Sequence, residues 1–150
     1  MNKWDSRFLD LSKHVSQWSK DPSTKVGAVI ADSENRIISL GYNGLARSVE
    51  DKEEIYNNRE LKYKCIVHAE INAILFAERH RLQGATLYTY PFMPCGRCAP
   101  SIIQSGIGRV VSYNNAVSRW RESFELSKTQ LEEANVELVL YEKIQTKTNN

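Results

Sequence analysis

The chain has 150 residues, 41% of them hydrophobic and 25% charged, and its 20 basic and 18 acidic residues leave a formal net charge of +2. This length suits about one domain, and the composition excludes disordered and fibrous proteins. The balance of charge argues against a large nucleic-acid interface. We therefore expect residues 1–150 to form a single domain with a frayed polar tail at 142–150.

The start of the chain gives no targeting signal. MNKWDSRFLDLSKHVSQWSK carries charges throughout and lacks the apolar core of a signal peptide, and no later stretch approaches about 20 apolar residues. We expect a cytoplasmic protein without a membrane segment. Its three cysteines should then be thiols or metal ligands, because disulfides are rare in that compartment.

The first elements are an amphipathic helix and a hairpin. Apolar residues recur at helical spacing at Trp4, Phe8, Leu11, Val15 and Trp18. DPST (21–24) ends this helix, since a proline disfavours helical geometry in the residue before it. VGAVIA (26–31) and RIISLGY (36–42) flank a polar turn and predict a hairpin with at least one strand buried on both faces.

A polar region separates the hairpin from a strong helix former. Residues 44–64 predict a loop with a short helix, which we interpret as a candidate lid. HAEINAILFAERHRL (68–82) predicts a helix buried on most sides, and Gly84 ends it.

Alternating strands and helices complete the chain. ATLYTY (85–90), RVVSY (109–113) and VELVLY (136–141) predict strands, CGRCAPSIIQSG (95–106) predicts a short helix, and a last helix carries Trp120, Phe124 and Leu131. The fold class is α/β, with a sheet of about five strands and helices on both faces. The later strand-helix-strand units should be parallel, with right-handed crossovers.

Two cysteines three residues apart carry the main chemical signal. Cys95 and Cys98 in PCGRC suit a redox pair, a structural zinc site or a catalytic zinc site. His68 begins a predicted helix, with Glu70 two residues later. If both helices begin at the same edge of the sheet, His68 and the two cysteines converge there, and helix N-termini favour thiolates. Cys65 as a fourth ligand would instead make a closed structural site.

The motifs together resemble a known family. HAE (68–70) and PCGRC (94–98) match the H-x-E and P-C-x-x-C pattern of zinc nucleobase deaminases. DPSTKVGAVI, GYNG and HAEINAI are similar to the deoxycytidylate (dCMP) deaminase branch of the cytidine/deoxycytidylate deaminase superfamily, from about Trp4 to Tyr141. The resemblance implies a three-layer cytidine-deaminase-like fold around a central mixed sheet.

The resemblance also implies an activity. It is the hydrolysis of dCMP to dUMP and ammonia, which supplies dUMP for thymidylate synthesis. One catalytic zinc ion per subunit would be held by His68, Cys95 and Cys98 and would activate the water that attacks C4 of cytosine. Glu70 would carry a proton to N3 and to the departing amino group.

Substrate contacts and assembly follow from the same resemblance. The backbone around Ala69 and Met93 would read the base edge, Asn43 and Asn72 would hold the sugar and 5′-phosphate, and Lys25 is a weaker phosphate candidate. Members of this fold are homo-oligomers, and a hexamer is favoured. We expect the subunit contacts on the segment 44–64 and on the stripe of Trp120, Phe124 and Leu131.

Some features depart from the family pattern. The proline that usually follows GYNG is replaced in GYNGLARSVED, which puts regulation by dCTP and dTTP in doubt, and YTYPFMPC is one residue longer than expected. The alternatives are a deaminase of cytidine or of another cytosine nucleotide, a deaminase of a base in tRNA, and a non-catalytic zinc-stabilised binding module. The preference among dCMP, a 5-substituted dCMP and a ribonucleotide stays open.

Overall fold

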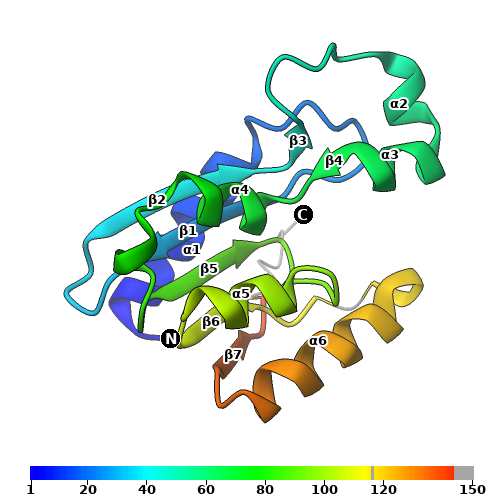
Figure 1. Cartoon of the computed structure of the whole chain (residues 1–150). Coiled ribbons are helices and arrows are strands. Elements are labelled where there is room, and N and C mark those ends of the chain that lie inside the picture. Colours follow the sequence, from blue (N-terminus) through cyan, green and yellow to red (C-terminus); the bar gives the residue numbers. More distant parts are fainter. Residues whose placement is uncertain (116, 144–150) are drawn as a thin grey trace, which may run out of the picture.

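A five-stranded mixed sheet forms the centre of the protein (Figure 1). The computed structural model describes residues 1–115 and 117–143, so most of the predicted polar tail lies outside the described residues. The strand order is β2-β1-β5-β6-β7, where β1 is antiparallel to β2 and β5, and β6 is parallel to β5 and β7. The strands are β1 (Gly27–Ala31), β2 (Ile37–Tyr42), β5 (Thr86–Tyr90), β6 (Arg109–Tyr113) and β7 (Glu137–Tyr141). The predicted hairpin and the parallel later units are confirmed.

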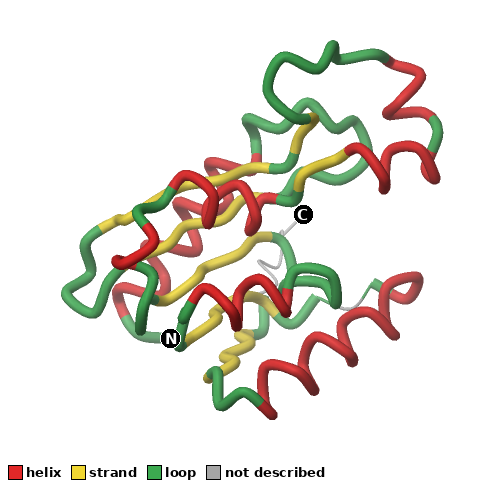
Figure 2. Tube along the Cα trace, viewed as in Figure 1, coloured by secondary structure: helices red, strands yellow, loops and turns green. Residues whose placement is uncertain are grey.

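Helices cover both faces of this sheet, which gives three layers (Figure 2). One helix, α1 (Lys3–Ser16), packs on one face, chiefly against β1 and β5. The opposite face carries α4 (Ala69–Phe76), α5 (Ala99–Ser105) and α6 (Arg121–Glu133). Two short 3-10 turns, η1 (Arg79–Arg81) and η2 (Ser118–Trp120), precede β5 and α6. None of the helices in the described ranges has the length and apolar character needed to cross a membrane.

The alternation of side chains along the strands produces two cores. Every residue of β1 is buried, and Val29 packs with Phe8 and Leu9 of α1 on one face. On the other face, Ile30 packs in a larger cluster with Ala73 of α4. Because successive strand residues point to opposite faces, one fully buried strand serves both layers.

Two glycines allow helices to lie directly on the strands. A Cβ atom at Gly41 of β2 would overlap the Ala69 carbonyl oxygen of α4, and one at Gly27 of β1 would overlap the Ser12 carbonyl oxygen of α1. Both positions need a residue without a side chain for this close approach. Gly41 therefore fixes how near the N-terminus of α4 lies to the sheet.

The segment between β2 and α4 extends past the end of the sheet (Figure 1). It contains β3 (Gly44–Leu45) and β4 (Ile66–Val67), which pair antiparallel, and the short helices α2 (Glu53–Asn57) and α3 (Arg59–Cys65). The sequence predicted one short helix in a loop here. The structure has two, separated by the extended residue Asn58, whose side chain caps α3 by accepting a hydrogen bond from the Leu61 amide.

The predicted helix over 68–82 is too long. α4 ends at Phe76, and Ala77 and Glu78 are extended before η1. Burial on most sides is also wrong, because Leu75 is 69% exposed and Phe76 62% exposed. The helix former preferences of this stretch continue past Phe76, but the chain must turn back there to begin β5 on the sheet.

Two predicted apolar stripes also differ from the structure. α1 ends at Ser16, so Trp18 lies beyond it and is 49% exposed. In the last helix Leu131 is fully buried, whereas Trp120 and Phe124 pack on Phe92 beside a cavity. Leu131 therefore belongs to the core, and Trp120 and Phe124 form part of the cavity wall. A role of this stripe in assembly stays a prediction.

Candidate active site

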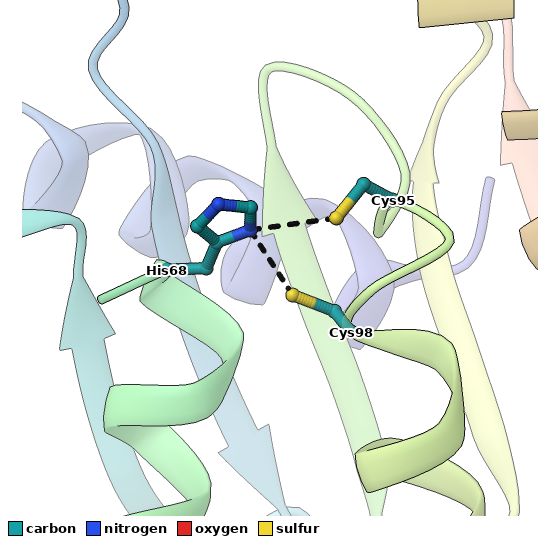
Figure 3. Close-up of side chains that lie close together, drawn as sticks. All are labelled: His68, Cys95 and Cys98. Atoms are coloured by element: carbon teal, nitrogen blue, oxygen red, sulfur yellow. Dashed lines mark hydrogen bonds between the residues drawn. The ribbon is translucent and has the colours of Figure 1, made fainter. Parts of the chain in front are cut away.

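Three side chains with metal-ligating atoms converge at the starts of α4 and α5 (Figure 3). His68 is the N-cap residue of α4, Cys98 is the N-cap residue of α5, and Cys95 lies in the turn three residues before Cys98. The Nδ1 atom of His68 lies 3.2 Å from the Cys98 Sγ atom and 3.4 Å from the Cys95 Sγ atom. The predicted convergence is present, although α5 begins only at Ala99.

The turn that carries Cys95 is tied at several points. The Cys95 carbonyl accepts hydrogen bonds from the amides of Cys98 and Ala99, each at 3.1 Å. The Gly96 amide donates to the Ser123 Oγ atom of α6 at 2.9 Å. This hydrogen bond joins the cysteine turn to α6, the C-terminal helix, which lies later in the sequence.

The donor set fits zinc. Zinc takes nitrogen and sulfur ligands in tetrahedral geometry, in which a nitrogen and a sulfur ligand lie roughly 3.5 Å apart. The separations from the His68 Nδ1 atom are close to that value. Cys65 does not belong to this group in the described part of the chain. Three protein ligands are the number found in catalytic zinc sites, which keep a fourth position for water.

The two thiols titrate as a coupled pair. The hydrogen bond from Cys98, together with the one to His68, lowers the pKa of Cys95 to about 4. The same bond to Cys95, burial and the nearby Glu70 carboxylate raise the pKa of Cys98. The bond to Cys95 raises the pKa of His68. Cys95 is therefore the first thiolate of the pair, as expected for a thiol beside a cation at a helix start.

Glu70 brings a carboxyl group to the same place. It lies in the first turn of α4, is only 3% exposed, and its Oε2 atom is 3.8 Å from the Cys98 Sγ atom. Burial raises the pKa of Glu70, against the opposing effect of His68. A carboxyl group whose pKa is raised holds its proton more readily than an exposed one, as a general acid must before it delivers that proton.

Two of the three candidate ligands, His68 and Cys95, line a cavity of about 250 Å³. One wall belongs to the turn 21–26, one to α3 and the start of α4, and one to the cysteine turn and α6. The lining residues are Asp21, Thr24, Val26, Asn43, Lys62, Tyr63, Ile66, His68, Ala69, Glu70, Phe92, Cys95, Arg97, Trp120, Ser123 and Phe124. The cavity is large enough for the base and part of the sugar of a nucleotide.

The structure brings two of the five predicted substrate contacts to this cavity. Ala69 and Asn43 line it, and the Asn43 amide bridges the Thr24 carbonyl and the Val26 amide at 2.8 and 2.9 Å. The other three lie outside the lining. Lys25 is exposed, Met93 is buried, and the Asn72 side chain donates to the Tyr42 carbonyl at 2.8 Å.

Sequence reasoning missed most of the cavity wall. Lys62 and Asp21 form a buried ion pair at 3.2 Å, although they stand far apart in the sequence. Arg97 has no sequence signal beyond its place between the two cysteines, and its Nη1 atom donates to the Tyr63 carbonyl at 2.8 Å. The sequence predicts Trp120 as an apolar position of the last helix, but it gives no sign that Trp120 contacts Tyr63 across the cavity.

Comparison with protein families agrees with this chemistry. The model of the cytidine and deoxycytidylate deaminase zinc-binding region matches residues 2–114. The chain belongs to this deaminase family. The resemblance read from HAE and PCGRC is thereby confirmed, and so is zinc as the metal of the site.

Relatives of the deaminase cover most of its length. An uncharacterized deaminase of Aliivibrio fischeri is 43% identical over 141 residues, which span 92% of this chain and 93% of the relative. A probable deoxycytidylate deaminase of Drosophila melanogaster is 38% identical over 89% of this chain and 70% of its own. The deoxycytidylate deaminase of Homo sapiens is 34% identical over 86% of this chain and 73% of its own.

A solved structure shares the deaminase fold. The dCMP deaminase of cyanophage S-TIM5, solved in complex with dCMP and dUMP, superimposes with a TM-score of 0.72 at 22% identity, over 95% of this chain and 99% of that chain. The predicted cytidine-deaminase-like α/β fold is confirmed.

Proposed function

We propose that this deaminase hydrolyses dCMP to dUMP and ammonia and so supplies dUMP for thymidylate synthesis. The observation that carries the proposal is the buried Glu70 carboxyl beside three side chains with zinc-ligating atoms, at a cavity that accommodates the base and part of the sugar of a nucleotide. The names of the Drosophila and human relatives favour dCMP among the cytosine compounds.

His68, Cys95 and Cys98 would hold one zinc ion per subunit. Bound there, zinc supplies a Lewis acid that makes water a nucleophile near neutral pH. Glu70 takes one proton from the water as its oxygen adds to C4 and delivers that proton to N3 of cytosine. Glu70 then moves the second proton of the former water to the amino nitrogen, the bond between C4 and this nitrogen breaks as the C4 carbonyl forms, and ammonia leaves.

The residues that contact the nucleotide remain proposals. Ala69 and Asn43 line the cavity and suit contacts with the base edge and the sugar. Asn43 already joins two backbone groups, so it also shapes the wall near Thr24. Contacts from Met93, Asn72 and Lys25 stay predictions of the sequence, as do the single domain, the cytoplasmic location and the homo-oligomer.

Two alternatives are weaker. A solved structure of a tRNA:A34 deaminase, which acts at the wobble position of transfer RNA, superimposes with a TM-score of 0.50 at 20% identity, and this shows the shared fold alone. A non-catalytic zinc module needs four protein ligands, and Cys65 does not belong to the ligand group in the residues described.

Ammonia release from a panel of compounds tests the proposal. The panel contains dCMP, CMP, deoxycytidine, cytidine and an adenosine-bearing tRNA stem-loop, and zinc content is measured on the same protein. We expect one zinc ion per chain and release confined to dCMP. Ammonia release from cytidine at the same rate as from dCMP would show that the enzyme does not recognise the 5′-phosphate. A protein that contains zinc but releases ammonia from none of the compounds would favour the binding module.

A further inference from the structure

Tyr63 and Trp120 meet across the cavity described above. The indole Nε1 atom of Trp120 donates to the Tyr63 hydroxyl at 3.2 Å, and both residues line the cavity. Tyr63 belongs to α3, whereas Trp120 belongs to η2 at the start of the C-terminal helix. This hydrogen bond therefore joins two walls that are 57 residues apart in sequence.

The residue before Tyr63 ties α3 to the other side of the cavity. The Lys62 ammonium group lies 3.2 Å from the Asp21 Oδ2 atom and donates to the Ser23 Oγ atom at 2.8 Å. Both Lys62 and Asp21 are buried. Consecutive residues of α3 thus reach the turn 21–24 on one side and η2 on the other, and α3 spans the cavity between them.

The Trp120 indole is fixed independently of Tyr63. Its ring packs against Phe92 with a centroid separation of 5.1 Å and against Phe124 with one of 6.3 Å. These aromatic contacts hold the indole N–H toward α3. The tyrosine, by contrast, is 37% exposed, and its side chain has the Trp120 hydrogen bond to orient it over the cavity.

We propose that Tyr63 and Trp120 are positioning residues that hold α3 in the shape required for the nucleotide, so that little ordering is needed when the substrate binds. The inference rests on the proposed function, because it takes a pyrimidine nucleotide as the occupant. The segment that carries α3 is joined to the rest of the molecule through a pair of two-residue strands and a few side chains. The bond to Trp120 adds to the Lys62 contacts and to the hydrogen bond from Arg97 to the Tyr63 carbonyl, and without it a larger cost of ordering α3 opposes binding.

The test uses Tyr63→Phe, Trp120→Phe and the double variant in the zinc-loaded enzyme. Tyr63→Phe keeps the ring and removes only the hydroxyl, whereas Trp120→Phe removes the indole N–H and leaves a smaller aromatic ring against Phe92 and Phe124. We expect each single variant to raise both KM for dCMP and Kd for the product dUMP about two- to tenfold, the range for one hydrogen bond. The value of kcat should stay within about twofold, since the lost interaction acts on binding and not on the chemical step. The double variant should match the single variants, because both remove the same bond.

Tyr56→Phe is the matched control. Tyr56 lies on α2 of the same segment, and its hydroxyl bonds to Asp51 at 3.1 Å, away from the cavity lining. This variant should keep the wild-type Kd for dUMP. Amide hydrogen exchange of residues 59–65 in the unliganded enzyme should become faster in the Tyr63 and Trp120 variants and stay unchanged in the control.

The outcomes separate this inference from the proposed function. A wild type that releases no ammonia from dCMP contradicts the proposed function, while hydrogen exchange still decides whether the pair holds α3 in place. If the wild type deaminates dCMP but the variants bind dUMP equally well, the inference is overturned. It is also overturned if the two single effects multiply in the double variant, because the residues then act separately.

Discussion

The Glu70 carboxyl is the group in the site whose removal separates chemistry from metal binding. It is buried beside Cys98 but is not one of the three ligands. We predict that Glu70→Gln lowers kcat/KM for dCMP by about 10²- to 10⁴-fold, the usual contribution of a general acid and base. Zinc content should stay at the wild-type level, because the ligand side chains are unchanged. Steady-state kinetics and metal analysis of the same preparation check both expectations.

Cys65→Ala is the companion variant for Glu70→Gln. Cys65 ends α3 and lies outside the ligand group, so its loss should leave both zinc content and activity unchanged. Loss of zinc from Cys65→Ala, or full activity in Glu70→Gln, would contradict the open catalytic site and favour a closed structural one.

Another buried carboxylate, Asp5, contributes to stability outside the cavity lining. It accepts two hydrogen bonds from Arg109, both at 2.8 Å, one from Tyr141 at 2.7 Å and one from Tyr88 at 3.1 Å. We predict that Asp5→Asn lowers the free energy of unfolding at pH 7 by about 2 to 4 kcal/mol, because Arg109 loses its buried partner. Urea unfolding measures the difference, and Asp10→Asn on the exposed side of the same helix should change it little.

The effect of Asp5 should depend on pH in one direction. Burial raises the pKa of Asp5, but the hydrogen bonds from Arg109 and Tyr141 outweigh burial, and the net pKa lies below its usual range. A carboxylate with a lowered pKa stabilises the fold above its unfolded pKa of about 3.9, and this contribution is lost as the pH falls through the folded value. The difference between wild type and Asp5→Asn should therefore shrink below about pH 4. A constant difference down to pH 2 would contradict this account.

At the scale of elements, the contact between β2 and α4 sets the position of the ligand His68. Alanine at Gly41 would press its Cβ atom into the Ala69 carbonyl oxygen at the start of α4. We predict that Gly41→Ala destabilises the fold by about 1 to 3 kcal/mol and lowers kcat/KM by about 10²-fold, because the first turn of α4 must shift. Gly44→Ala is the control, since an added Cβ there meets nothing within 4 Å. Equal activity in the two variants would show that α4 tolerates the shift.

The elements that could be predicted from the sequence are those with a strong local pattern. β1 and β6 are apolar runs bounded by turn residues, and both strands are present. α4 was overextended because composition favours helix through Leu82, whereas its end at Phe76 is determined by the path of the chain toward β5. Local propensity does not contain that constraint, which comes from the packing of later elements.

At the scale of the whole molecule, the site also contains residues that a local pattern predicts and residues that only the fold brings together. His68, Cys95 and Cys98 were predictable because their residue types and spacing carry metal chemistry. Lys62 and Asp21, which form an ion pair, are separated by 41 positions in the sequence, and Trp120 and Tyr63, which share a hydrogen bond, by 57. No sequence motif has either spacing, so these contacts of the cavity wall could not be predicted without the folded structure.

Assembly is the remaining property of the whole molecule, and an apolar surface at the end of α4 bears on it. Leu75 and Phe76 are 69% and 62% exposed, and Val49, in the segment expected to make subunit contacts, is 50% exposed. The Arg47 guanidinium lies over the Phe76 ring at 5.7 Å, which places the two regions together.

We predict a homo-oligomer, seen by light scattering as a mass that is a multiple of 17.2 kDa. Phe76→Glu should lower this mass, because it removes an apolar side chain from the interface and adds a charge whose desolvation is costly even beside Arg47. Leu126→Glu, at a 52% exposed position on α6, should leave it unchanged. A monomeric wild type at assay concentration would exclude the assembly, and an intact oligomer in Phe76→Glu would place the interface elsewhere.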